Sequence, residues 1–306
     1  MKICYCLASS GEDWYPEMTY ISASCVRRLH RAARITILMD VDTYNMPIRE
    51  PFDVRGLADH VVRVEVGLDG PAPRSRFLKT SMRQLVDGAF LFLDSDTLPI
   101  RPFRELFEST ASMSAAFDRN IENPRPHFPE FAGRLLSEVG WPSPLPNYYN
   151  GGVIHFSDQD ESRALGVEWH RRWRLLYERF REHRDQPALN SAIHALDIHP
   201  RVFPIQYNAM VGVAARFAHK AKIFHFYTSS GKPREGTLLD HLVKHMFSRR
   251  EIDWRAIDTA IRFGAVWAHG FRWEFGMGHY ARAVQCLAAH LRSRIIGRGP
   301  PRLPDN

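Results

Sequence analysis

Cysteine is scarce in this chain, and long apolar runs are missing. The cysteines follow none of the spacings of structural zinc sites and suggest no disulfide framework; they are Cys4, Cys6, Cys25 and Cys286. No apolar run reaches the roughly 18 residues that a membrane span needs. The apolar run after Lys2 is too short for the core of a signal peptide. We therefore expect a protein of the reducing cytoplasm rather than a disulfide scaffold or an integral membrane protein.

A dense block of basic residues is also missing, although the net charge is +7. A moderate basic excess is compatible with anionic substrates, with an anionic membrane surface or with nucleic acid, and does not choose between them. Because no nucleic-acid-binding motif is present, we expect no nucleic-acid partner. The 306 residues suffice for one large core or a core with a small appendage.

Apolar segments alternate with amphipathic ones in the first part of the chain. Strands are expected at 2–8, 35–40, 60–66 and 89–93, and helices at 15–30 and 75–87. This alternation is typical of an α/β fold with a parallel sheet and right-handed crossovers.

The later part of the chain has three distinct regions. Residues 119–147 form an irregular stretch around one short helix at 129–139, which is typical of a lid or substrate loop. Residues 161–182 form an amphipathic helix whose aromatic stripe we interpret as core. Residues 236–292 are expected to be mostly helical.

Two carboxylates follow the most apolar of the expected strands. Residues 89–93 are continuously apolar, and Asp94 and Asp96 come directly after them. A continuous apolar run indicates a strand buried on both faces, and ligands of open α/β sheets bind at the carboxyl ends of such strands. Two hard oxygen ligands suit Mg²⁺ or Mn²⁺, which complete their coordination with phosphates and water. The alternative is a strand that ends in a solvated acidic turn.

Two further patches place polar side chains beside short structural elements. The first is interpreted as a polar turn before a strand and contains Asn150, Gly151 and Gly152. Glycine lets the backbone approach a ligand closely, although an Asn-Gly pair is also typical of an ordinary turn. The second patch is Asp185 and Gln186 at the start of a helix, and the alternative to a functional role is that Asp185 merely caps this helix.

Two more patches and one helical residue add candidate ligand-binding groups. His225 lies in an apolar strand, where a lone histidine is often structural. Gly231 and Lys232 form a turn that presents one ammonium, and a solvated lysine is the alternative. Lys79, on the helix before the Asp94 strand, is one of only six lysines in the chain.

The order of these patches resembles that of GT-A glycosyltransferases, specifically the retaining family of glycogenin-like and bacterial lipooligosaccharide galactosyltransferase-like enzymes. The resemblance covers about residues 2–235 and runs through Lys79, Asp94, Asp96, Asn150, Gly151, Gly152, Asp185, Gln186, His225 and Gly231. It implies a mixed, mainly parallel sheet flanked by helices, with a catalytic domain at 1–235. A helical extension at 236–306 would pack on that domain and end in a flexible tail, 297–306.

The resemblance also implies roles for individual residues. Mn²⁺, or Mg²⁺, would be held by Asp94, Asp96 and His225. The reacting sugar would lie beside Asp185, Gln186 and Asn150. The nucleotide-sugar donor would contact Lys79 or Arg76, Asp118, Gly151, Gly152, Gly231 and Lys232, and its base would lie near Ala8 and Tyr15. The turn at Gly231 is shorter than the family's and lacks its tryptophan, which puts its geometry in question.

The activity implied is metal-dependent transfer of a sugar, with retention, from a UDP-sugar to an unidentified saccharide, lipid-linked or small-molecule acceptor. Three alternatives stay open: an inverting GT-A enzyme, a haloacid-dehalogenase-like phosphatase and a sugar-nucleotide-binding module without turnover. The inverting enzyme needs a carboxylate base, for which Glu122, Glu130 and Glu138 are candidates. Aromatic residues mixed with arginines after residue 271 fit either peripheral membrane contact or ordinary packing.

Overall fold

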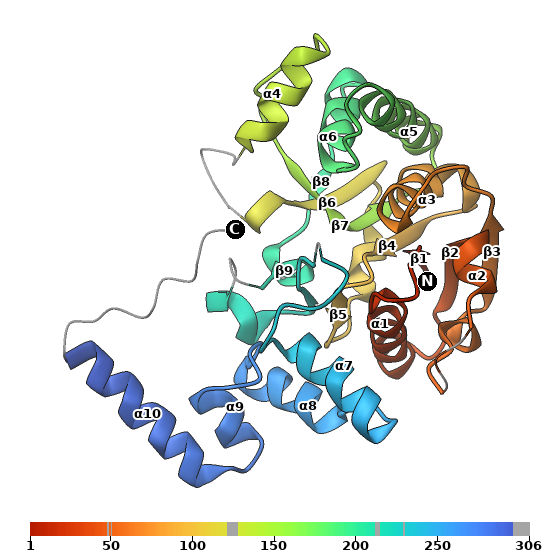
Figure 1. Cartoon of the computed structure of the whole chain (residues 1–306). Coiled ribbons are helices and arrows are strands. Elements are labelled where there is room, and N and C mark those ends of the chain that lie inside the picture. The colour runs from red at the N-terminus through yellow and green to blue at the C-terminus, as the bar shows by residue number, and fades with distance from the viewer. Residues whose placement is uncertain (48, 50, 121–127, 212–214, 229, 296–306) are drawn as a thin grey trace.

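The centre of the computed structural model is a seven-stranded sheet with the order β3-β2-β1-β4-β7-β6-β8 (Figure 1). The structure describes residues 1–47, 49, 51–120, 128–211, 215–228 and 230–295. The strands of this sheet are β1 (Lys2–Leu7), β2 (Arg34–Asp40), β3 (His60–Val64), β4 (Phe90–Leu93), β6 (Met113–Phe117), β7 (Tyr149–Phe156) and β8 (Arg201–Val202).

Strands β3, β2, β1 and β4 pair in parallel, as the expected crossovers require. Strand β7 pairs antiparallel with both β4 and β6, so the sheet is mixed but mainly parallel. The fold class expected from the sequence is confirmed. Because β7 runs opposite to β4, β7 begins beside the carboxyl end of β4. The candidate site lies at this point.

The helices have these bounds: α1 (Tyr15–Leu29), α2 (Val41–Asn45), α3 (Pro71–Leu85), α4 (Glu130–Glu138), α5 (Asp160–Phe180), α6 (Gln186–Ala195), α7 (Leu238–Arg249), α8 (Trp254–Phe263), α9 (Phe271–Gly276) and α10 (Tyr280–Ile295). Helix α3 begins four residues before the expected start, because Pro71 at its first position is compatible with the fixed backbone of a first turn. None of the described helices combines the length and hydropathy of a membrane span.

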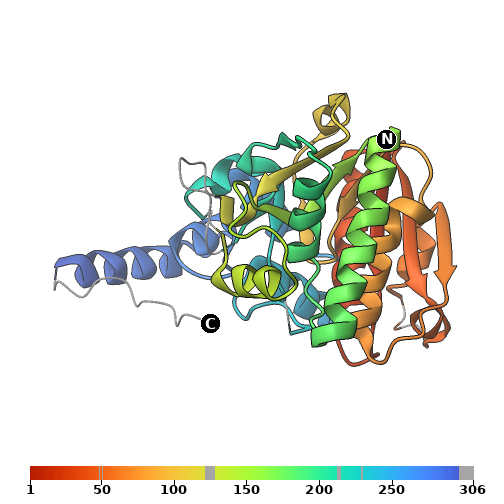
Figure 2. The same ribbon diagram turned by 90° about the horizontal axis from the view of Figure 1, so that it is seen from above.

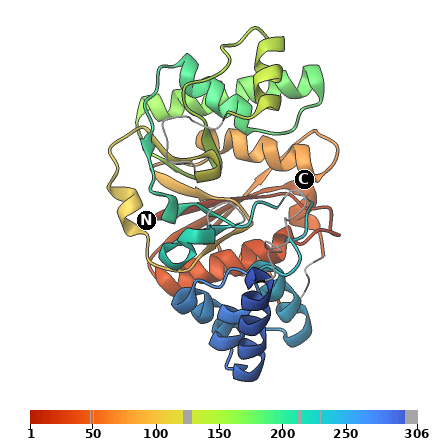
Figure 3. The same cartoon turned by 90° about the vertical axis from the view of Figure 1, so that its left-hand side faces the viewer.

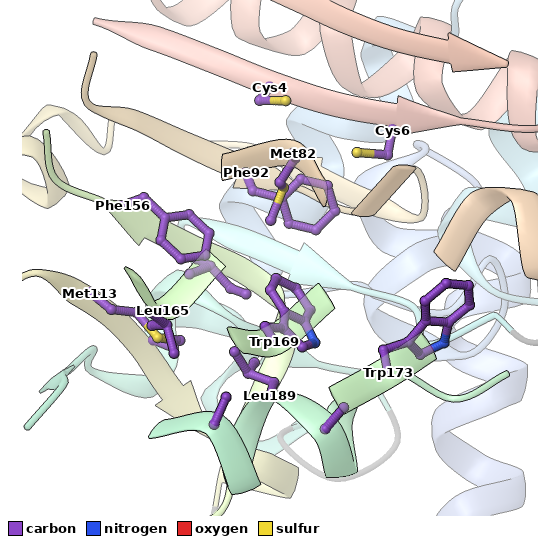
Figure 4. Packing of buried hydrophobic residues seen from close by; sticks show 14 of the residues in the cluster. Cys4, Cys6, Met82, Phe92, Met113, Phe156, Leu165, Trp169, Trp173 and Leu189 are labelled. Carbon is purple, nitrogen blue, oxygen red and sulfur yellow. The ribbon is translucent and has the colours of Figure 1, made fainter. Parts of the chain in front are cut away.

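Helices cover both faces of the main sheet (Figure 3). Along β1, Cys4 and Cys6 face a core formed with α3, α5 and α6, whereas Ile3 and Tyr5 face the core on the α1 side. Alternation of side chains along a strand produces these two cores. The aromatic stripe of α5 is core, as expected (Figure 4); Leu165, Trp169, Trp173 and Leu176 are fully buried.

A second, three-stranded sheet lies beside α1 and has the order β5-β10-β9, formed by Thr97–Pro99, Ile223–His225 and Ala209–Met210. Helices α7, α8 and α9 share a hydrophobic core with α1 and β10, which includes Ile21, Phe224 and Leu242. Helix α10 extends away from the rest of the molecule (Figure 2). The expected flexible tail, 297–306, lies outside the described residues.

Candidate active site

The candidate site lies where β4 ends and β7 begins. Leu93, the last residue of β4, is opposite Val153, and the Asp94 N–H donates to the Gly152 carbonyl at 2.9 Å. The expected polar turn at Asn150 is therefore wrong: Asn150, Gly151 and Gly152 are part of strand β7. An Asn-Gly pair can lie in this strand because Tyr149 pairs with Phe117 of β6 and the Gly152 carbonyl accepts the Asp94 N–H, so tertiary pairing on both sides overrides the local turn preference.

A tight turn after Asp94 brings β5 back toward the sheet. The Thr97 N–H and hydroxyl both donate to the Asp94 carbonyl, at 3.0 and 2.7 Å. Strand β5 then pairs antiparallel with β10, which places His225 opposite Thr97. The Phe226 N–H donates to the Asp96 carbonyl at 3.0 Å, so two segments far apart in the sequence converge at the carboxylates.

Asp94, Asp96 and His225 form a group that fits a divalent ion. One candidate ligand atom from each side chain lies within 4.8 Å of the others, and His225 Nε2 is 3.4 Å from Asp96 Oδ1. Asp96 and His225 are buried, whereas the Asp94 side chain is partly exposed. Two carboxylate oxygens and one imidazole nitrogen suit Mn²⁺, and suit Mg²⁺ less well because of the nitrogen.

Burial and the neighbouring charges shift the pKa values of Asp96 and His225 in opposite directions. Burial raises the pKa of Asp96, but the neighbouring His225 and the Thr228 N–H lower it to below its usual value. Burial lowers the pKa of His225, but Asp96 and Asp94 raise it above its usual value. The Asp96 carboxylate is therefore ionised at neutral pH, as a metal ligand must be.

Asn208, which the sequence did not point to, orients the His225 ring. His225 Nδ1 lies 2.9 Å from Asn208 Oδ1, and the Asn208 amide donates to Asn150 Oδ1 at 2.9 Å. This contact favours the tautomer that carries its proton on Nδ1, which leaves Nε2 free to bind a metal. The Asn150 amide in turn donates to Asp118 Oδ1 at 3.0 Å. A single buried amide network thus links the histidine to Asp118.

The His225 ring leaves no room for a side chain at position 152, so this position requires glycine. A Cβ atom at Gly152 would lie 2.2 Å from His225 Cε1, 2.7 Å from Nδ1 and 2.8 Å from Nε2. Gly151 is less crowded, since its Cβ would lie 3.3 Å from Asp185 Oδ2 and 3.5 Å from Lys79 Nζ. The two glycines therefore make room for the side chains of the site itself.

Asp185 lies at the N-cap position of α6, but its side chain forms no capping hydrogen bond. It instead pairs with Arg76 at 3.2 Å and with Lys79 at 3.4 Å. Burial raises the pKa of Asp185, but Lys79 and Arg76 lower it to below its usual value. Lys79 also lies 3.0 Å from Asp94, so its buried ammonium bridges the two acidic groups. The reading of Asp185 as only a helix cap is wrong.

Gln186 begins α6 and contacts the start of β7. Its Oε1 accepts hydrogen bonds from the Asn150 amide at 3.3 Å and from the Gly151 N–H at 3.2 Å. The three residues expected beside the reacting sugar, Asp185, Gln186 and Asn150, therefore lie together next to the acidic group at Asp94.

The residues expected around the nucleotide and diphosphate do not all lie at the acidic group. Ala8 is buried just after β1. The Tyr15 hydroxyl donates to the Thr228 carbonyl at 3.5 Å, and the Thr228 N–H donates to Asp96. The Gly231 carbonyl accepts from the Trp14 N–H at 2.8 Å, which places this turn beside Tyr15.

Lys232 is exposed, and none of its described contacts joins it to the acidic group. Its Nζ lies 5.6 Å from the centre of the Trp14 ring. The structure thus brings Gly231 to the edge of the site but leaves the ammonium of Lys232 in solvent. A role of Lys232 toward a diphosphate stays a prediction.

The fold is similar to that of solved glycosyltransferase structures. The galactosyltransferase LgtC in complex with donor and acceptor sugar analogs has a TM-score of 0.51 and 15% identity, over 75% of this chain and 88% of LgtC. An active-site mutant of LgtC has a TM-score of 0.53 and 13% identity, over 84% of this chain and 100% of the mutant. The bifunctional glycosyltransferase WbbM has a TM-score of 0.50 and 14% identity, over 75% of this chain and 46% of WbbM.

No protein-family model and no curated protein sequence matches the chain. The architecture is that of the GT-A glycosyltransferases, as the sequence resemblance implied. Within that class, the fold is related to that of LgtC, and the low identity carries this likeness no further than the fold.

Proposed function

We propose that this protein is a metal-dependent glycosyltransferase that moves a sugar, with retention, from a nucleotide-diphosphate sugar to an acceptor hydroxyl. The observation that carries the proposal is the convergence of Asp94, Asp96 and His225 on one point at the sheet edge of a glycosyltransferase fold. We further propose a UDP-linked donor and a saccharide, lipid-linked or small-molecule acceptor. The similar galactosyltransferase LgtC binds donor and acceptor sugar analogs, which supports a sugar donor and a saccharide acceptor.

The charges around the group fit such a donor. A divalent ion held by Asp94, Asp96 and His225 would act as a Lewis acid toward the leaving diphosphate. Lys79 and Arg76 pair with Asp185 and lower its pKa, so this carboxylate stays ionised despite its burial. We propose that Asp185 stabilises positive charge at the sugar carbon, with Gln186 and Asn150 positioning the sugar.

The structure weakens two of the alternatives. The GT-A architecture is at odds with the haloacid-dehalogenase-like phosphatase. Of the base candidates for an inverting enzyme, Glu130 and Glu138 are exposed on α4, and Glu130 pairs with Arg134. Glu122 lies outside the described residues.

Donor binding and donor cleavage, measured separately, distinguish a binding module without turnover from an enzyme. We expect nucleotide sugars to raise the melting temperature of the protein only when Mn²⁺ is present. An enzyme should also release nucleoside diphosphate slowly without acceptor, whereas a binding module should release none.

The decisive variant is His225→Phe, which keeps an aromatic ring in the buried position. We expect it to stay folded but to lose Mn²⁺-dependent donor binding and turnover. A matched control is His155→Phe, because His155 is also buried in a strand but belongs to the central sheet. An active His225→Phe protein would show that His225 is structural and would remove the basis of the metal assignment.

A further inference from the structure

Two histidines and an aspartate converge at the corner between α7 and α8. His241 and His245 lie one turn apart on α7, so both side chains project from the same face of the helix. Asp253 is the N-cap of α8, three residues after the left-handed residue that ends α7. One possible ligand atom from each of these side chains lies within 4.8 Å of the others.

Each of the three side chains has a second neighbour. Asp253 Oδ1 accepts the Ala256 N–H at 3.0 Å, which leaves Oδ2 to face the histidines. The His241 ring meets Trp273 edge to face, with ring centres 4.8 Å apart. His245 Nε2 lies 3.7 Å from a carboxylate oxygen of Glu251, while its Nδ1 faces Asp253. The Trp273 ring restrains the His241 ring by packing, and the Glu251 carboxylate, beyond hydrogen-bond distance, adds negative charge beside His245.

An ordinary helix cap does not account for the second histidine. His241 Nε2 is 2.8 Å from Asp253 Oδ2, which satisfies that oxygen with one hydrogen bond. His245 Nδ1 is 3.8 Å from the same oxygen, which is too far for a hydrogen bond but suits two ligands of one ion. All three side chains are partly exposed, so an ion could enter from solvent.

From this arrangement we propose a second metal site, formed by His241, His245 and Asp253, that binds Zn²⁺. Two imidazoles and one carboxylate are typical zinc ligands, and three protein ligands leave a fourth position for water. None of these residues belongs to the group at Asp94. The ion would join the middle of α7 to the start of α8 and so stabilise the helical region that packs on α1.

The test is the number of zinc ions that the full chain binds, measured by competition with a chromophoric chelator. We compare the wild type with Asp96→Asn, His245→Gln and Asp253→Asn. Asparagine still caps a helix, so Asp253→Asn removes the ligand charge while keeping the cap. His269→Gln is the control, because His269 is an exposed histidine of the same region.

We expect the wild type to bind one zinc ion at His241, His245 and Asp253. Asp96→Asn and His269→Gln should still bind this ion. In His245→Gln and Asp253→Asn its affinity should fall by on the order of 100-fold, since losing a ligand costs at least as much as losing an outer partner. Cobalt should give the visible absorption of a four-coordinate site in the wild type and in Asp96→Asn.

Unchanged zinc affinity in His245→Gln and Asp253→Asn would overturn the proposal and leave only a helix cap with a neighbouring histidine. If the variants do not fold, the cobalt spectrum decides the question. Absorption that is lost in Asp96→Asn, or is absent from the wild type, would equally contradict a site at His245.

Discussion

Gly152→Ala tests whether the lack of a side chain at Gly152 makes the space that the His225 ring occupies. Alanine adopts the backbone angles of Gly152 without strain, so the added methyl group is the whole perturbation. The Cβ would lie 2.2 Å from His225 Cε1, and ordinary contact begins near 3.4 Å. The ring must therefore move by about 1 Å, away from contacts with Asn208 at 2.9 Å and Asp96 at 3.4 Å.

We expect two effects of different size from this displacement. Overpacking should lower the free energy of unfolding by about 1–3 kcal/mol. Misplacing one of three ligands should weaken Mn²⁺ binding by about 10–100-fold, as the loss of ligand orientation does elsewhere.

The Mn²⁺ affinity is measured by isothermal titration calorimetry. The free energy of unfolding of the same protein is measured by urea denaturation. Gly56→Ala is the control, since no described atom lies within 4 Å of its added Cβ. Gly151→Ala, with its nearest neighbour at 3.3 Å, should give an intermediate result. Wild-type Mn²⁺ affinity in a folded Gly152→Ala protein would refute the role assigned to His225.

Three further predictions concern other parts of the site and the core. Asp96→Ala should abolish Mn²⁺-dependent donor binding in calorimetry while its circular dichroism stays native; full turnover would disprove the metal assignment. Lys232→Ala should lower turnover by on the order of 10²–10³-fold with a smaller loss of donor affinity, and a rate within about threefold of wild type would mean that Lys232 is only a solvated loop residue. Burial lowers the pKa of His155 to about 4, and neither ring nitrogen has a hydrogen-bond partner among the described residues. Because the unfolded state binds the extra proton, stability should fall as pH drops from about 6.5 to 4, by about 2 kcal/mol at pH 5. His155→Leu should flatten that part of the pH profile in urea unfolding, and an unchanged profile would assign the acid sensitivity to other groups.

Local sequence patterns were sufficient for most elements of the fold. The apolar run at 90–93 and the stripe of Trp169 and Trp173 predict a buried strand and a core helix, because their spacing reports burial directly. The alternation of apolar and amphipathic segments also indicated the fold class, and the order of the motifs carried the resemblance to the GT-A enzymes.

Contacts made only in the folded chain could not be predicted in this way. Asn208 precedes a two-residue strand in an irregular region and forms no pattern, yet it orients His225. Strand β7 is defined by pairing with β4 and β6, which only the folded chain makes, whereas the local sequence at Asn150 and Gly152 predicts a turn. Asp185 has the sequence of a helix cap, but its side chain pairs with Lys79, and this pairing arises only when α3 and α6 meet at the site.

Metal-dependent cleavage of a nucleotide-diphosphate sugar at Asp94, Asp96 and His225 is the activity proposed for this chain. Release of UDP from a panel of UDP-sugars, with and without Mn²⁺, by the wild type and by Asp96→Asn tests it. We expect Mn²⁺-dependent release from at least one donor by the wild type and none by the variant. Release that is equal in the two proteins, or equal without metal, would disprove the proposed activity.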